Sequence, residues 1–372
     1  MKNLLSYTCM AFLCCTLASS CINEYFDDFG SDKDATVELT VSMPSSVESD
    51  LDNLTKVTTE KEEGSSYENT IVGTNDIRIF AFDVTNANDP NTYETLIGEA
   101  YDLICTDPDA STVRLIKGKL PKQALGRTVK LVMMANYQGR LNNNDGTLDK
   151  KDSIPAPGTK KYSEWMQPLK FNYGDKPWSE NDAADGKYIP MSGETILYIK
   201  DNSKAVNQTS IQLTRAIAKV RIIIKETSQY YLTNLQTNNA AGKSFDFAHY
   251  TPEGDVMIPK VTNGIYLTLN FPSLSVKPNK PVEFFEFYLP EQPMKKTTLQ
   301  LGMTENGRLP GGDNTVQESL EFKDYGSGAY FPIERNYIYE FWVGKKKDET
   351  KADISIGIEP WIVEDEIISD YE

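Results

Sequence analysis

The sequence offers few residues for catalysis, and its histidine content is the strongest limit. Its 372 residues include one histidine, His249, within Phe-Asp-Phe-Ala-His-Tyr. Serine–histidine and cysteine–histidine nucleophile pairs, like histidine-rich zinc sites, need imidazole at a defined place, and the surroundings of His249 match no such motif. The 54 acidic residues still allow a two-carboxylate glycosidase, because sequence spacing does not fix the distance between two acids. We predict a protein that is not an enzyme.

The best candidate for a metal site is the loop at residues 141–152. Asp145, Asp149 and Asp152 fit a calcium-loop template, but Leu141 stands where the template needs Asp. The Asn-Asp-Gly sequence in this loop is also an ordinary tight turn. We therefore expect a turn, no metal and no cofactor, since the chain has no Gly-rich phosphate loop and no Cys-x-x-Cys.

The cysteines indicate export and lipidation. Residues 1–20 combine one Lys, an apolar run and small residues, which is typical of a secretory signal peptide. The signal ends at Cys21 and resembles the lipobox of bacterial lipoproteins, in which this thiol is acylated and becomes the new N-terminus. Ordinary signal cleavage nearby, with Cys21 unmodified, is the alternative. Only Cys21 and Cys105 would remain in the mature chain, so no disulfide framework is expected.

Composition describes a folded, acidic protein. The formal net charge is −16, and 39% of the residues are hydrophobic. An acidic balance argues against nucleic acid as a partner, because phosphate binding needs a Lys- and Arg-rich surface. Residues 21–34 contain several acids and predict a flexible tether, and the total length favours two domains.

The first expected strand has unusually clean alternation. Val37, Leu39, Val41 and Met43 alternate with polar residues, which predicts a strand with one buried face. Residues 44–73 lack apolar periodicity and predict a long loop of the functional or disordered kind.

Short strand-like segments separated by Pro and Gly follow along the rest of the chain, with almost no helical periodicity. This pattern predicts an all-β protein of sandwich type. We expect an N-terminal sandwich domain at residues 35–207 and a C-terminal one at 208–372. Trp165 and Trp178 lie in a polar, turn-rich region, where they could stack on sugar rings or cover the end of a sandwich; we favour the second role.

Several separated pieces of the sequence together resemble the Bacteroidales fimbrillin family of pilus subunits. The resemblance spans essentially the whole mature chain and rests on the order and spacing of these pieces. They are the signal ending at Cys21, the strand at 37–43, the long loop, and the segments 76–83, 131–136, 189–193, 213–220, 287–291, 333–336 and 360–361.

The resemblance implies two tandem transthyretin-like β-sandwich domains and a structural fimbrial subunit that mediates cell adhesion. It places the protein at the outer membrane through a lipid on Cys21 and then on the cell surface, with other fimbrial subunits and a host or bacterial surface ligand as partners. In this family a protease cuts the loop after the first strand, that strand leaves, and a strand from another subunit takes its place. The strand released here would carry Val37, Leu39, Val41 and Met43.

The processing site departs from the family pattern. Family members are cut after Arg, whereas the mature chain has no Arg before Arg78. Lys56 is the matching candidate and Lys61 the second. The alternative is a subunit that is never cut and stays lipidated as an anchor or accessory subunit.

The C-terminal segment is the candidate donor strand, because C-terminal strands supply the donor in this family. Its alternating apolar residues are Ile354, Ile356 and Ile358. The alternative is a plain final strand of the second domain. For the whole protein, the rival hypothesis is a surface glycan-binding lipoprotein of a nutrient-uptake system, with the same anchor and exposed Trp residues.

Overall fold

The computed structural model describes more than half of the residues, and these form several separate segments of the chain. The described residues are 34–42, 77–106, 113–136, 141–142, 155–165, 170–172, 188–241, 244–246, 249–250, 256–257, 266–271, 273–278, 284–292, 297–305, 307 and 315–360. Nearly all regular structure among them is β, so the all-β prediction is confirmed. No helix in these segments is long and apolar enough to cross a bilayer.

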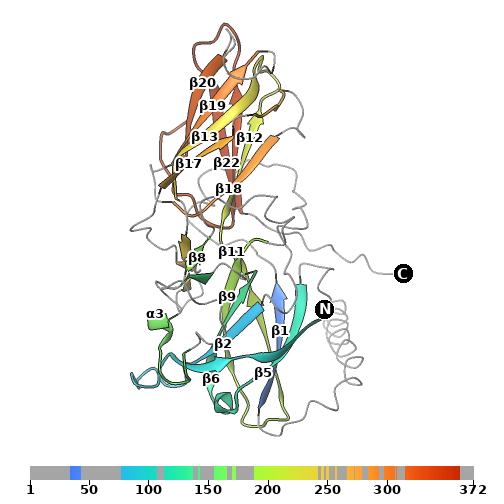
Figure 1. The fold of residues 1–372 in the computed structure, drawn as a ribbon, viewed down its shortest axis with the longest axis vertical. Coiled ribbons are helices and arrows are strands. Elements are labelled where there is room, and N and C mark those ends of the chain that lie inside the picture. Colours follow the sequence, from blue (N-terminus) through green and yellow to red (C-terminus); the bar gives the residue numbers. More distant parts are fainter. Residues whose placement is uncertain are drawn as a thin grey trace, which may run out of the picture.

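Two sheets form the first half of the fold, in the lower part of Figure 1. The first sheet has the order β10-β1-β5-β4 and the second β11-β9-β6-β2-β3, and both contribute to one hydrophobic cluster. The strands are β1 (Ala35–Ser42), β2 (Ile77–Asp83), β3 (Thr95–Glu99), β4 (Tyr101–Thr106), β5 (Val113–Leu120), β6 (Thr128–Ala135), β9 (Met191–Tyr198), β10 (Val206–Gln212) and β11 (Thr214–Arg215).

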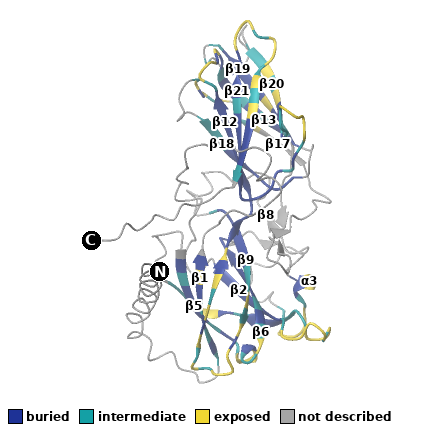
Figure 2. Ribbon diagram, turned by 180° about the vertical axis from the view of Figure 1, so that it is seen from behind, coloured by how far each residue is buried: buried dark blue, intermediate teal, exposed yellow. Residues whose placement is uncertain are grey.

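Two further sheets form the second half, with the orders β18-β12-β21-β22 and β17-β13-β19-β20 around a second hydrophobic cluster. Figure 2 shows buried residues along the strands of both halves and exposed residues in the end loops. The strands are β12 (Ala218–Ile224), β13 (Tyr231–Ala241), β17 (Tyr266–Phe271), β18 (Phe284–Leu289), β19 (Thr298–Thr304), β20 (Thr315–Glu321), β21 (Tyr337–Gly344) and β22 (Asp353–Pro360). Short strands β7 (Leu141–Asn142), β8 (Lys170–Asn172) and β14 (Ser244–Asp246) form a small sheet, and β15 (His249–Tyr250) pairs with β16 (Val256–Met257).

Strand β2 is buried on both faces, and its sequence Ile-Arg-Ile-Phe-Ala-Phe-Asp places apolar residues on both of them. One face takes part in the core between the two sheets. The other is covered by the short helix α3 (Tyr162–Trp165), because the Trp165 ring packs edge-on against Phe80 with ring centroids 4.8 Å apart, and Tyr162 packs edge-on against Phe82. Trp165 is 8% exposed, so it serves the core and not a sugar-binding surface.

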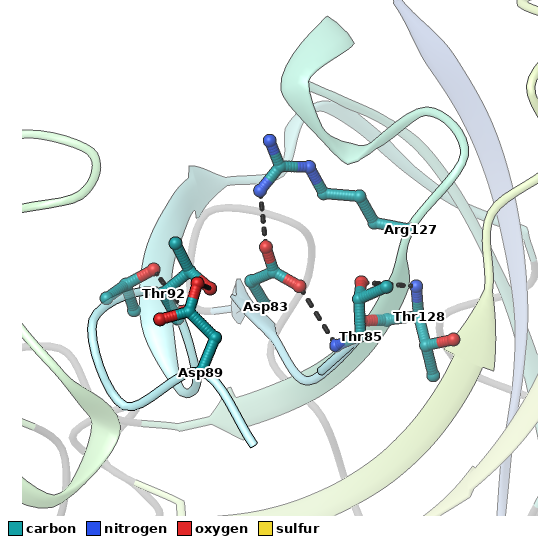
Figure 3. Close-up of polar contacts among 7 residues, drawn as sticks. Asp83, Thr85, Asp89, Thr92, Arg127 and Thr128 are labelled. Atoms are coloured by element: carbon teal, nitrogen blue, oxygen red, sulfur yellow. Dashed lines mark hydrogen bonds and ion pairs between the residues drawn. The ribbon is translucent and has the colours of Figure 1, made fainter. Parts of the chain in front are cut away.

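Polar side chains fix the turn that follows β2 (Figure 3). The Asp83 carboxylate accepts a hydrogen bond from the Thr85 backbone N–H at 3.0 Å and forms an ion pair with Arg127. The Thr128 N–H donates to the Thr85 hydroxyl at 3.1 Å, which ties the turn to the start of β6. Burial raises the Asp83 pKa, but the hydrogen bonds from Thr85 and the hydrogen bond and charge of Arg127 outweigh burial and hold the pKa below its ordinary value.

The two halves meet through buried contacts. Tyr288 and Ile338 from the second half belong to the hydrophobic cluster of the first. The fully buried Arg215 donates a hydrogen bond to the Asn336 side chain at 2.8 Å, and the Asn336 backbone N–H donates to the Ile217 carbonyl. The division into domains at residue 208 stays a prediction; in the structure that residue lies within β10, which pairs with β1.

Candidate functional site

The strand β1 occupies the middle of its sheet, although it is the first described strand of the chain. It pairs in parallel with β10 from Thr36↔Val206 to Ser42↔Gln212. On its other side it pairs antiparallel with β5 along its whole length. We call the space between β10 and β5 that this strand fills the β1 groove.

The inner face of β1 closes the hydrophobic cluster of the first half. Ala35, Val37, Leu39 and Val41 are each at most 1% exposed. Burial of one Val or Leu side chain stabilises a fold by about 1.5–3 kcal/mol, so this strand contributes substantially to the core. The predicted buried face is confirmed for Val37, Leu39 and Val41, while Met43 lies outside the described residues.

The outer face of β1 carries a three-residue polar rung. Gln208, Glu38 and Lys117 are direct neighbours across β10, β1 and β5. The Lys117 ammonium lies 2.7 Å from Glu38 Oε1, and the Gln208 amide donates to Glu38 Oε2 at 2.8 Å. The Lys117 and Glu38 side chains are only 10% and 15% exposed, so this ion pair is well shielded from solvent.

A second polar contact holds the backbone of β1. Asn207 is 2% exposed, and its amide donates to the Thr36 carbonyl at 2.9 Å. Its oxygen accepts from the Lys200 backbone N–H at 2.9 Å, which fixes the orientation of the amide. The side chain therefore recognises a backbone carbonyl, whatever side chain occupies that position of the strand.

Sequence reasoning missed Lys117, Gln208 and Asn207. They lie about 80 and 170 residues from their β1 partners, and no local motif marks them. The only available signal was Glu38, the one charged residue of this strand. A carboxylate on a central strand needs a hydrogen-bonding or charged partner on a neighbouring strand.

The pKa of Glu38 predicts an acid-sensitive contribution to stability. Burial alone raises this pKa, but the hydrogen bonds from Lys117 and Gln208 and the charge of Lys117 outweigh it, so the pKa lies below its ordinary value. The charged form is therefore favoured by folding, and its contribution is present above the unfolded-state value of about 4.3 and is lost as pH falls through the folded-state value. We expect Glu38→Gln to lower the melting temperature at pH 7.

The check is a pair of melting curves measured between pH 7 and pH 3. The wild-type and Glu38→Gln melting temperatures should begin to converge below about pH 4.3 and should meet once pH has fallen through the lower pKa of folded Glu38, because protonation then removes the same charge that the substitution removes. A constant gap between the two variants over the whole range would contradict this role of Glu38.

The candidate donor strand is paired within its own chain. All eight residues of β22 pair antiparallel with β21, at one edge of the sheet. Ile356 and Ile358 are buried and Ile354 is partly buried against the cluster of the second half. Its role as donor or as plain final strand stays open at this point.

The two halves share a pairing pattern that sets β22 apart. In the second half β12 pairs in parallel with β21 and antiparallel with β18, as β1 does with β10 and β5 in the first half. The strand β21, which corresponds to β10, carries β22 on its far edge, whereas β10 is the last strand of its described sheet. The strand β22 is thus an addition to the pattern common to both halves.

Other candidate residues lie outside the described segments. These are the proposed lipidation site Cys21, the processing candidates Lys56 and Lys61, the calcium-loop candidates Asp145, Asp149 and Asp152, and Trp178. Among the described residues there is no group of three or more side chains that could hold a metal ion.

Comparison with known proteins gives structural likeness only. No family model and no curated protein sequence matches the chain. A tip fimbrial protein of Porphyromonas gingivalis, truncated at its C-terminus, matches with a TM-score of 0.49 and 12% identity over 88% of this chain and 100% of that one. A fimbrial assembly protein of Parabacteroides distasonis matches with a TM-score of 0.47 and 13% identity, over 88% of this chain and 95% of that one. A fimbrial protein of Bacteroides vulgatus matches with a TM-score of 0.42 and 9% identity, over 87% of this chain and 99% of that one.

These structural neighbours are fimbrial proteins of Bacteroidales, the group that the sequence pieces resemble. At such identities and TM-scores the likeness assigns no function by itself.

Proposed function

We propose that the chain is a structural subunit of a cell-surface fimbria that mediates adhesion, is exported as a lipoprotein through Cys21 and assembles by strand donation. The observation that carries this proposal is the place of β1. It is a central strand, yet only residues 43–76 join it to the rest of the described fold. One cut in that stretch separates β1 from every later strand and leaves the remaining chain continuous.

Removal of β1 would leave a groove whose unpaired backbone favours the binding of another strand. Within its described sheet β10 pairs with β1 alone, so loss of β1 leaves β10 without a ladder and opens one edge of β5. Unpaired backbone groups and a vacated apolar trough are the features that β-augmentation satisfies, since an extended segment supplies hydrogen bonds and alternating side chains together. Cleavage after Lys56 or Lys61 is the step that we propose removes the anchor with β1.

The edge position of β22 suits a donor. A strand at an edge leaves its sheet by breaking one ladder, whereas a central strand must break two. We propose that Ile354, Ile356 and Ile358 of one subunit enter the β1 groove of the next. A subunit that is never cut would instead keep β1 and act as a lipidated anchor.

The test is N-terminal analysis of the protein in fimbriae sheared from cells. We expect a polymerised chain that begins within residues 44–76, near Val57 or Glu62, and lacks Ala35–Ser42. A variant with Lys56→Ala and Lys61→Ala should accumulate as a lipidated monomer. Fimbriae built from chains that still begin at an acylated Cys21 would contradict the proposal.

A further inference from the structure

The apolar alternation of β1 cannot set the register of a strand in the β1 groove. Side chains repeat every two residues along a strand, so a slip of one residue reverses the faces but a slip of two keeps every apolar residue inside. Small or β-branched residues occupy most inner positions of β1, and a slipped strand of similar sequence would still bury them. A further feature must therefore distinguish registers that differ by two residues.

The polar contacts on β1 supply such a feature. Gln208 and Lys117 hold a carboxylate at one position, that of Glu38. Among the contacts described, Glu38 is the one β1 side chain that is bound by side chains from both neighbouring strands. Two residues earlier, Asn207 holds the Thr36 carbonyl. A two-residue slip would move the acid off the rung and place Thr36 or Thr40 there.

We propose that Lys117 and Gln208 select an incoming strand by a carboxylate at the Glu38 position, while Asn207 anchors its backbone at the Thr36 position. The inference rests on the proposed exchange of β1 and defines the partner of the groove more narrowly. That partner is a strand of another copy of this chain, with alternating apolar residues and an acid directly before or after them.

The strand β22 has an acid at each end of its Ile series, Asp353 before it and Glu359 after it. With Glu359 at the Glu38 position, Pro360 would take the inner position of Leu39, and a central strand disfavours proline, so the register of Asp353 is the one that fits. Ile354, Ile356 and Ile358 have Asp353 immediately before them. When Asp353 takes the Glu38 position in the direction of β1, Ile354 and Ile356 take the inner positions of Leu39 and Val41. Two other registers place Ile354 at position 37 or 35. They put Ser355 or Gly357 at the Glu38 position, so no carboxylate lies between Lys117 and Gln208.

In the monomer Asp353 pairs with Lys225 at 2.8 Å, and its side chain is 71% exposed. An exposed ion pair of this kind contributes little to stability, so it offers little resistance when Asp353 changes partners. The same carboxylate would thus leave Lys225 and meet Lys117 of the next subunit.

The test uses the full chain with a specific protease site inserted between residues 44 and 73. After cleavage, labelled peptides with the sequence of residues 34–43 compete for the β1 groove, and they carry Glu, Gln or Lys at position 38. We expect the Gln peptide to bind at least about tenfold more weakly, because a hydrogen bond to a charged group is stronger than one to a neutral group, and the Lys peptide to bind more weakly still. A Thr40→Val peptide is the matched control and should bind like the native one.

A charge-exchanged chain separates charge recognition from simple damage. The full chain with Glu38→Lys and Lys117→Glu should fold, and after cleavage it should prefer the Lys peptide over the Glu peptide. If no peptide enters, not even the native one, the strand exchange of the proposed function is wrong and the inference fails with it. If the Glu, Gln and Lys peptides enter equally well, exchange stands and acid selection is overturned.

Discussion

Leu39→Ala is expected to lower the free energy of unfolding by about 3 kcal/mol. Leu39 is 0% exposed and lies near the middle of a strand with a ladder on each side. Its side chain contributes to the cluster shared by both sheets of the first half. The two ladders restrict the backbone on either side, so the structure cannot collapse to fill the cavity and the cost should lie within the usual range of about 2–5 kcal/mol for such substitutions.

Urea unfolding followed by tryptophan fluorescence measures this effect, and Thr40→Val is the matched control. Thr40 is the next residue, faces outward and is exposed. A β-branched replacement keeps its strand preference, and we expect a change within about 0.5 kcal/mol. Equal small effects at both positions would mean that β1 is not part of the core.

Glu291→Ala is expected to cost about 3–5 kcal/mol, because it leaves a buried guanidinium without its carboxylate. Arg335 binds Glu291 through two parallel contacts, of which Nη2 to Oε2 is 2.7 Å, and the two side chains are 2% and 5% exposed. Asn336, the residue after Arg335, receives the hydrogen bond from Arg215 of the first half. The ion pair therefore holds the segment through which the two halves meet.

Two further variants distinguish a buried pair from a generally sensitive protein. The double substitution Glu291→Leu with Arg335→Met should recover most of the loss, since a packed apolar pair replaces the buried charges. Glu349→Ala breaks the exposed Lys346–Glu349 contact at 3.5 Å and should change stability by less than about 0.5 kcal/mol. A Glu291→Ala effect as small as that of Glu349→Ala would contradict the role given to the junction pair.

Local patterns in the sequence predicted much of the fold. The alternation of Val37, Leu39 and Val41 indicated one buried face, and the structure has it. Ile354, Ile356 and Ile358 indicated the strand that became β22. Each of these signals depends on residues two positions apart, which the side-chain period of a strand makes readable from sequence.

Long-range pairing could not be predicted in the same way. The parallel partner of β1 comes about 170 residues later, and nothing in either sequence specifies that ladder. The rung of Glu38 with Lys117 and Gln208 exists only because three strands from distant parts of the chain lie side by side. The role of Trp165 could not be predicted for the same reason, because its contact with Phe80 depends on where a short helix packs.

The central claim is that β1 must leave before the subunit polymerises, and a reversible lock tests it most directly. Thr40 and Leu115 are direct partners on β1 and β5, so cysteines at both positions, in a Cys105→Ala background, should form a disulfide that holds β1 in its groove. We predict that the oxidised, protease-treated protein stays monomeric and forms denaturant-resistant polymers only after reduction. Polymers that form equally well with the disulfide intact would contradict the account.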